Sequence, residues 1–441
     1  MIQLSEHFNY KKLLRFTLPS IIMLVFTSIY GVVDGFFVSN FVGKNAFTAV
    51  NFIMPVLMIM GAIGFLFGTG GGALIAKTIG EGDREKANRT FSFIVCATIV
   101  CALIITVIGL IVIRPLAAFL GAEGELLENS VKYGCVVMIA VPAFVLQFEF
   151  QCLFSTAEKP KLGLYVTIAA GVTNMVFDAV FVAWFQWGLV GAAAATALGQ
   201  CVGGLSPILY FARPNSSLLR LTKFRFDGKA LLKTVTNGSS ELLSNISMSV
   251  VSMLYNAQLL KYAGEDGVAA YGVLMYVNLV FLAMFIGYSV GMSPIVSYHF
   301  GAQNHGELKS VLKKNLVIIS IFAVLMFGAA ELLGGTIAKI FVSYDAELLE
   351  MTRHAFFLFS FSFLFAGFTI MGSSIFTALN SGFFSALISF LRTLVFQIAA
   401  VFVFPLFWGL DGIWLSIVGA EVMAVAVTLI LLVCNRKRFH Y

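Results

Sequence analysis

Long apolar runs separated by short polar segments dominate the hydropathy pattern of this chain. About twelve runs stand out, near residues 13–37, 47–78, 91–113, 131–156, 162–185, 189–211, 231–260, 268–298, 311–333, 355–379, 383–407 and 412–434. Most reach the roughly 20 residues that a helix needs to cross about 30 Å of hydrocarbon. The dyad alternation of a membrane β-barrel is absent, so helices remain as the way to satisfy the backbone. The pattern predicts an all-α integral membrane protein with twelve transmembrane helices.

Composition supports lipid as the solvent for most of the chain. Of 441 residues, 59% are hydrophobic and 11% are charged, whereas about 25% are charged in soluble domains. The first apolar run is too long for a signal peptide and is expected to remain in the protein. The cysteines lack CxxC spacing and the histidines form no metal-spaced cluster, so we expect neither a cofactor nor a structural metal.

The basic residues are distributed unevenly between the polar segments. With the N-terminus placed inside, most of the 28 Lys and Arg residues fall on the cytoplasmic side. The positive-inside rule then predicts both termini in the cytoplasm and an even number of crossings. The net charge of +6 is thus interpreted as membrane topology and not as nucleic-acid binding. We expect a multi-pass membrane protein with both ends in the cytoplasm.

Sequence features of the first half of the chain recur in the second half at a nearly constant interval. "GELLE" at 124–128 returns as "AELLE" at 346–350, and "WGLVG" at 187–191 returns as "WGLDG" at 408–412. The apolar spacing repeats as well. We predict an N-lobe (1–212, helices 1–6), a cytoplasmic linker (213–230) and a C-lobe (231–441, helices 7–12), related by an axis along the membrane normal. Two such lobes suit alternating access by a secondary transporter.

The stretch "GFLFGTGGGALIAKTIGEGD" (64–83) contains many glycines. Gly61, Gly64, Gly68 and Gly72 recur at three or four residues, along one face of a helix, and no GK[ST] follows. We interpret them as a helix-packing face and not as a phosphate-binding loop. No other ATP-binding element occurs, so the energy for transport is expected from an ion gradient.

Five acidic residues lie at membrane depth, where a carboxylate costs about 2.5–3.5 kcal/mol. At about 1.5 Å per residue, three polar side chains lie at a similar depth, roughly 9–12 Å below the outer surface: Asp34, Asp178 and Thr196. Asn174 and Tyr30 lie one turn further in. The predicted oxygen-rich cluster comprises Tyr30, Asp34, Asn174, Asp178 and Thr196.

Two close carboxylates repel each other in a medium of low dielectric, so one of them is expected to hold a proton. Alternatively, the oxygens of Asp34, Asn174, Asp178 and Thr196 replace the water shell of Na⁺. A static hydrogen-bonded patch is the remaining interpretation. Pro19 interrupts the hydrogen-bond ladder of the first helix and is interpreted either as a hinge or as a passive kink.

The other intramembrane acids leave alternatives open. Glu149 and Glu241 either face a cationic substrate in a central cavity or pair with Arg392, the one basic residue within an apolar run. Glu421 receives no role. The 45 Phe and 16 Met residues suit a cavity that accepts varied flat cations through cation–π contacts and adaptable packing.

The chain resembles the MATE (multidrug and toxic compound extrusion) family, and most of all its bacterial MepA-like branch. The resemblance covers essentially the whole length. It is carried by Pro19, Tyr30 and Asp34, by "GTGGGALIAKTIGEGDREKA" (68–87), "STAEKPK" (155–161), "NMVFD" (174–178) and "GLVGAAAAT" (188–196).

The resemblance implies a V-shaped pair of six-helix lobes and a cation site at Asp34, Asn174, Asp178 and Thr196, with Pro19 linked to bending of the first helix. Glu241 matches an acid that some branches use in the second lobe, but "FTIMGSSIF" (368–376) lacks the Asp that accompanies it.

We therefore expect a secondary active multidrug antiporter that exports cationic or amphipathic drugs and dyes in exchange for inward H⁺ or Na⁺. A monomer embedded in lipid suffices for this activity. The alternatives are a MATE-related flippase for a lipid-linked or amphiphilic metabolite, a passive channel, and a membrane enzyme. The mostly acidic intramembrane charges disfavour a flippase for an anionic headgroup, and no catalytic motif supports an enzyme.

Overall fold

The computed structural model describes residues 2–343 and 345–441 and is built of helices, with no strand in these two ranges. The first half of the chain contains α1 (Tyr10–Phe37), α2 (Lys44–Gly80), α3 (Arg84–Phe119), α4 (Gly124–Thr156), α5 (Pro160–Asp178) and α6 (Gly188–Ala212). The second half contains α7 (Gly228–Gly301), α8 (His305–Val342), α9 (Ala346–Ser360), α10 (Phe363–Ala378), α11 (Gly382–Phe390), α12 (Phe396–Val403) and α13 (Pro405–Phe439). Short π-helical segments extend three of these helices: η1 (Val38–Val42), η2 (Ala179–Trp184) and η3 (Leu391–Val395).

The helices account for the predicted twelve crossings. Among the described residues, ten helices are long and apolar enough to cross a membrane, and α9 and α10, bent by 47° relative to each other, pass the same test when they are taken as one span. One of the ten, α7, is 74 residues long and breaks at Gly264, where φ is 64° and ψ is −152°. This break separates two helices, so α7 crosses twice. The expected loop between residues 260 and 268 is instead a sharp turn at one glycine.

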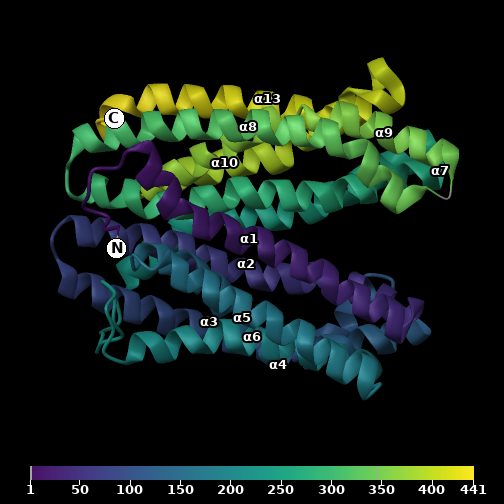
Figure 1. Ribbon diagram of the computed structural model, residues 1–441, viewed down its shortest axis with the longest axis horizontal. Helices are drawn as coiled ribbons and strands as arrows, with labels where there is room; N and C mark the ends of the chain where they lie inside the picture. Colours follow the sequence, from purple (N-terminus) through teal and green to yellow (C-terminus); the bar gives the residue numbers. More distant parts are fainter. Residues whose placement is uncertain (1, 344) are drawn as a thin grey trace.

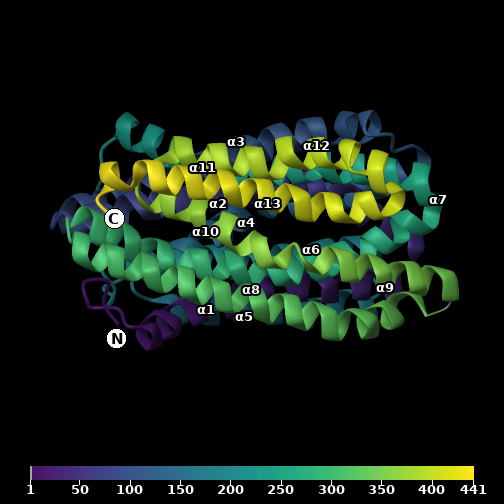
Figure 2. The same ribbon diagram turned by 90° about the horizontal axis from the view of Figure 1, so that it is seen from above.

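Both termini lie at the same end of the molecule, which we call the terminal end (Figure 1). Phe8 packs edge-on against His299, and Phe300 packs against Phe439 with ring centroids 6.0 Å apart. This placement agrees with an even number of crossings. Figure 2 shows the same bundle from above, with the helices running along its long axis from the terminal end to the far end.

Figure 1 shows the two halves of the chain side by side, with the first half from purple to teal and the second half from green to yellow. Close glycine contacts join them near the terminal end. A Cβ on Gly80 would lie 2.9 Å from the Ala302 nitrogen, and a Cβ on Gly301 would lie 2.9 Å from the Lys77 carbonyl carbon. Gly80 and Gly301 are equivalent positions in the internal repeat, and they contact each other's helices reciprocally. This reciprocity confirms the parallel repeat.

Backbone conformation repeats in the same register. Residues with positive φ form four equivalent pairs, one member in each half: Gly43 and Gly264, Gly82 and Gln303, Glu158 and Asn380, and Gly188 and Gly409. The turns between helices are therefore equivalent in the two halves. The exact boundaries 212 and 231 of the predicted lobes stay a prediction.

The predicted packing face of α2 lies against α4. A Cβ on Gly61 would meet the Phe144 and Phe148 rings, and a Cβ on Gly68 would lie 2.9 Å from the Glu149 carbonyl oxygen. A Cβ on Gly72 would lie 3.0 Å from Thr156 Oγ1. Glycine is required here because any larger side chain would separate the two helices.

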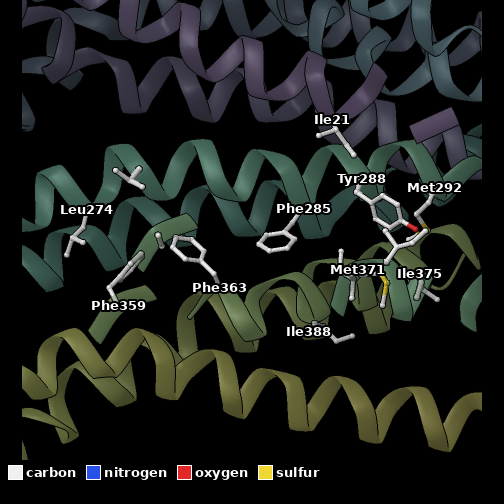
Figure 3. Packing of buried hydrophobic residues seen from close by; sticks show 14 of the residues in the cluster. Ile21, Leu274, Phe285, Tyr288, Met292, Phe359, Phe363, Met371, Ile375 and Ile388 are labelled. Carbon is white, nitrogen blue, oxygen red and sulfur yellow. The ribbon is translucent and has the colours of Figure 1, made fainter. Parts of the chain in front are cut away.

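The core of the second half continues into the first helix of the chain. Figure 3 shows Tyr288 and Met292 of α7 beside Met371 and Ile375 of α10, with Phe285 of α7 further along the same buried cluster. Ile21 of α1 belongs to the same buried cluster (Figure 3). The helix α1 thus belongs to the first half by sequence and packs on the second half near the terminal end.

Apolar side chains cover much of the outer surface. On α3, Leu103, Val107 and Ile111 are all more than half exposed. In water such a stripe would be an association or aggregation site, but in a bilayer it faces lipid tails.

The N-terminal segment forms a bridge at the terminal end. The Leu4 amide donates to Glu158 Oε1 of the first half at 2.5 Å, and the Phe8 amide donates to Glu307 Oε1 of the second half at 2.8 Å. The Lys314 ammonium donates to the Phe8 carbonyl. Leu4 and Phe8 are fully buried. Residues ahead of α1 therefore connect the two halves.

Candidate cation site in the first half

Three helices meet at the predicted cluster because glycines let them approach closely. A Cβ on Gly171 of α5 would lie 2.6 Å from the Phe26 ring and 3.1 Å from the Tyr30 ring of α1. A Cβ on Gly199 of α6 would lie 2.9 Å from Asn174 Cβ of α5. The sequence thus places α1, α5 and α6 within side-chain reach of one another.

Four of the five predicted residues come together at this junction. Thr196 Oγ1 donates to Asp34 Oδ1 at 3.2 Å, and Asn174 Nδ2 donates to Thr196 Oγ1 at 3.5 Å. The Asp178 carboxylate interacts electrostatically with that of Asp34. Asp34, Asn174 and Asp178 are buried, with 4%, 3% and 0% of their surfaces exposed.

The two aspartates occupy special positions on their helices. Asp34 lies in the last turn of α1 and Asp178 is the last residue of α5. Each is followed by a π-helical segment, η1 or η2. Such wider turns are often found at functional sites. Neither carboxylate oxygen of Asp178 has a hydrogen-bond partner among the described residues.

Tyr30 lies at the edge of this cluster. Its hydroxyl accepts a hydrogen bond from Gln147 Nε2 of α4 at 3.4 Å. The ring packs against Phe26, with centroids 6.0 Å apart. Tyr30 is therefore placed to support the helix junction, and its polar partner comes from a fourth helix.

Sequence reasoning missed what α4 contributes. Tyr133 of α4 is fully buried and close enough to interact electrostatically with Asp34 and Asp178. It follows Gly124, the first residue of α4, by nine positions, or about 13 Å at 1.5 Å per residue. Tyr133 thus lies at nearly the same depth as Asp34, so helix rise along α4 is the signal that identifies it.

Two further acids lie deeper between the halves. Glu149 of α4 is fully buried, and Glu241 of α7 is partly buried. Both carboxylates act electrostatically on Cys152 of α4, so they flank this residue where α4 approaches α7. A substrate-binding role for Glu149 and Glu241 stays a prediction.

The alternative interpretation, a salt bridge of Glu149 or Glu241 with Arg392, is wrong. Arg392 of η3 pairs with Glu421 of α13, with Nε 2.9 Å from Oε1 and 3.0 Å from Oε2. Glu241 experiences the charge of Arg392 without forming a salt bridge with it. The sequence gives depth along a helix, but the pairing depends on how each helix is rotated about its axis.

Comparison with known proteins identifies the family. The MatE family model matches residues 19–180 and again residues 242–403. The chain belongs to the MatE family. The double match also reproduces the internal repeat, because the two matched ranges have equal lengths and one lies in each half.

Curated relatives in this family cover nearly the whole chain. The multidrug export protein MepA of Staphylococcus haemolyticus is 25% identical over 435 residues, which cover 98% of this chain and 95% of the relative. MepA of Staphylococcus aureus is also 25% identical, over 96% of this chain and 93% of the relative.

Solved MATE structures share the fold. A MATE crystallised with MaL6 superposes with a TM-score of 0.91 at 22% identity, over 98% of this chain and 97% of that one. An outward-facing multidrug resistance MATE family transporter of the MOP superfamily also gives 0.91, at 23% identity, over 98% and 96%. The chain is therefore a multi-pass membrane protein of a transporter family with the MATE architecture.

Proposed function

We propose that this protein is a secondary active multidrug efflux antiporter. It exports cationic or amphipathic compounds in exchange for inward H⁺ or Na⁺ by alternating access. The observation that carries the proposal is the buried cluster of Asp34, Asn174, Asp178 and Thr196, drawn from three helices. The names of the MepA relatives, multidrug export proteins, support the substrate class.

The cluster has the chemistry of an exchange site for a small cation. Two buried carboxylates lie close together, and the hydroxyl of Thr196 and the amide of Asn174 add neutral oxygens. Carboxylate, hydroxyl and amide oxygens bind hard cations, and a proton on one carboxylate relieves the same repulsion. Coupling requires that the ion bind one arrangement of the helices better than the other.

The proposed orientation places the terminal end in the cytoplasm of a bacterial cell, following the positive-inside rule. The glycine contacts between Gly80, Gly301 and their partners then close the cytoplasmic side. The cation site lies toward the opposite side, where H⁺ or Na⁺ enters from outside. A potential of 100 mV supplies about 2.3 kcal/mol per entering charge, enough to drive modest uphill export.

The substrate is proposed to bind between the halves, near Glu149 and Glu241. A carboxylate there neutralises the charge of a cationic drug, which a low-dielectric site would otherwise exclude. Aromatic rings lie close by, with Phe65 and Phe148 stacked at 4.6 Å. The two halves of one chain suffice for this arrangement, so the protein is proposed to act as a monomer without a cofactor.

Dye efflux from vesicles tests the proposal. Asp34→Asn and Asp178→Asn are each expected to abolish ion-driven ethidium efflux while the protein still inserts and accumulates. Asp411→Asn is the matched control, because this exposed acid bonds His354 at 2.9 Å away from the cluster. Imposing Na⁺ and pH jumps separately identifies the ion. Normal coupled efflux from both cluster variants would remove the cluster from the mechanism.

A further inference from the structure

The repeat places a second polar core in the second half, at positions equivalent to the cation site. The offset that relates Gly43 to Gly264 also relates Asp34 to Tyr255. The Tyr255 hydroxyl lies 2.7 Å from Gln397 Oε1 and 2.8 Å from Ser416 Oγ. These two partners come from α12 and α13, which correspond to α5 and α6. At the position of the buried acid, the second half therefore has a neutral hydrogen-bonded group.

A charged pair lies one helical turn closer to the terminal end in the same half. Arg392 binds Glu421 through two nitrogens, with Nη2 2.8 Å and Nε 2.9 Å from Oε1. Thr369 Oγ1 of α10 donates to Glu421 Oε2 at 3.0 Å. The side chains of Arg392 and Glu421 are 14% and 6% exposed. Every charge of this pair is thus neutralised within the protein.

The first half has no such pair at the equivalent positions. With the 222-residue offset that relates Glu158 to Asn380, Arg392 corresponds to Ala170. With the 221-residue offset that relates Gly188 to Gly409, Glu421 corresponds to Gln200. Thr369 corresponds to Gln147, the residue that donates to the Tyr30 hydroxyl. Among the described residues, Asp34 and Asp178 of the first half thus have no basic partner within reach. In the second half, by contrast, Glu421 is paired with Arg392.

We infer that Arg392 is a tethered cation that permanently occupies the place a mobile coupling ion would take in the second half. This inference rests on the proposed antiport function. The guanidinium lies against the Glu421 carboxylate, where a free cation would otherwise bind, so no ion is exchanged at this carboxylate. The coupling ion then acts through the first half alone, and the second half moves without exchanging an ion. A planar guanidinium suits this role because its two parallel N–H donors match a carboxylate.

Among the described residues, Glu241 of α7 is the one further acid found to interact with this pair. On α7, Glu241 experiences the charge of Arg392, and the Tyr255 hydroxyl experiences that of Glu421. On α10 the neighbour is the neutral Thr369. Removing the guanidinium therefore leaves Glu421 to acquire a proton or a small cation from solution.

Arg392→Met tests the inference, because Met keeps the length of the side chain and removes its charge. In purified full-length protein, the Tm of this variant is expected to rise by several degrees on lowering the pH from 8 to 6 or on adding Na⁺. In vesicles, the slope of the logarithm of the efflux rate against pH is expected to steepen by about one, the signature of one additional bound proton. Arg392→Met/Glu421→Gln is expected to show the ion dependence of the wild type in both assays.

A purely structural salt bridge gives a different result. Arg392→Met would then lower the Tm equally at every pH and Na⁺ concentration, and this outcome would overturn the inference. If the single variant fails to fold, the double variant decides, because loss of coupled efflux from a folded double variant also overturns it. Wild type and Asp34→Asn are run alongside. The behaviour of these two proteins tests the proposed antiport function itself. A failure of that function can therefore be distinguished from a failure of the inference about Arg392.

Discussion

A single methyl group at the junction of the two halves should shift the conformational equilibrium of the transporter. Gly238 of α7 packs directly on the backbone of α2. A Cβ at this position would lie 2.6 Å from the Leu66 carbonyl carbon and closer still to its oxygen. Carbon atoms in contact lie about 3.5–4.0 Å apart, so Gly238→Ala requires the two helices to separate by roughly 1 Å.

The cost of that separation sets the size of the effect. Overpacking a tight contact costs about 1–3 kcal/mol. In alternating access this contact exists only while the terminal end is closed, so the cost falls on that state alone. At about 1.4 kcal/mol per tenfold, the ratio of open to closed terminal ends should increase by about 5-fold to more than 100-fold.

Spin-label distances across the terminal end measure this ratio. Labels at Arg89→Cys on α3 and Lys313→Cys on α8, in a background without the native cysteines, report the separation of the halves. Gly272→Ala is the matched control, because a Cβ at this position, in the part of α7 after the break at Gly264, meets nothing within 4 Å. Distance distributions of Gly238→Ala that equal those of the wild type and the control would refute the reasoning.

Two other predictions concern the cation site and the N-terminal bridge. Thr196→Val removes the hydroxyl that donates to Asp34 and should weaken Na⁺ coupling more than H⁺ coupling in vesicle efflux; equal losses would argue against direct Na⁺ ligation. Burial raises the pKa of Glu158 above its usual range, so its charge destabilises the fold increasingly as the pH rises through that raised pKa. Glu158→Gln should therefore increase the Tm at pH 8 and have no such effect below pH 4, whereas Glu158→Ala leaves the buried Leu4 amide unpaired and should cost about 1–3 kcal/mol. A Gln variant that melts like the Ala variant at pH 8 would contradict this account.

The position of the buried polar cluster was predictable because helix geometry is regular. A constant rise per residue converts distance from a span's end into depth, and this depth places Asp34, Asp178 and Thr196 together. The repeat was predictable for a similar reason, since glycines at turns and close contacts cannot be replaced freely. Depth and repeat together determined which helices would meet.

Pairing within the membrane was not predictable in the same way. Arg392, Glu241 and Glu421 all lie within apolar runs, and depth alone allowed several partners. Rotation about the helix axis decides between them, and in a chain that is apolar on all sides the sequence pattern gives little information about rotation. The turn at Gly264 was hidden for a related reason, because "AGEDG" reads as an ordinary loop.

The helix α1 connects the candidate cation site with the junction of the halves. Thr17 of α1 packs on Gly291 of α7, and Ile21 of α1 packs on Gly287, with Cβ positions 3.0 Å and 2.6 Å from the α1 backbone. Pro19 lies between these two contacts on α1, and its ring removes the hydrogen bond to the Arg15 carbonyl.

Asp34 lies fifteen residues further along α1, about 22 Å at 1.5 Å per residue. We propose that Pro19 is the hinge at which α1 bends, so that the segment from Pro19 to Asp34 moves relative to the junction of the halves. A bend of about 10° there would move Asp34 by about 4 Å relative to the junction, given the same helical rise. A displacement of this size would break the hydrogen bond of 3.2 Å between Thr196 Oγ1 and Asp34 Oδ1. The cluster is therefore intact in only one of the two positions of the helix, bent or straight. An ion that requires the intact cluster therefore selects one of them, and the same helix transmits this choice to the glycine contacts that hold the halves together.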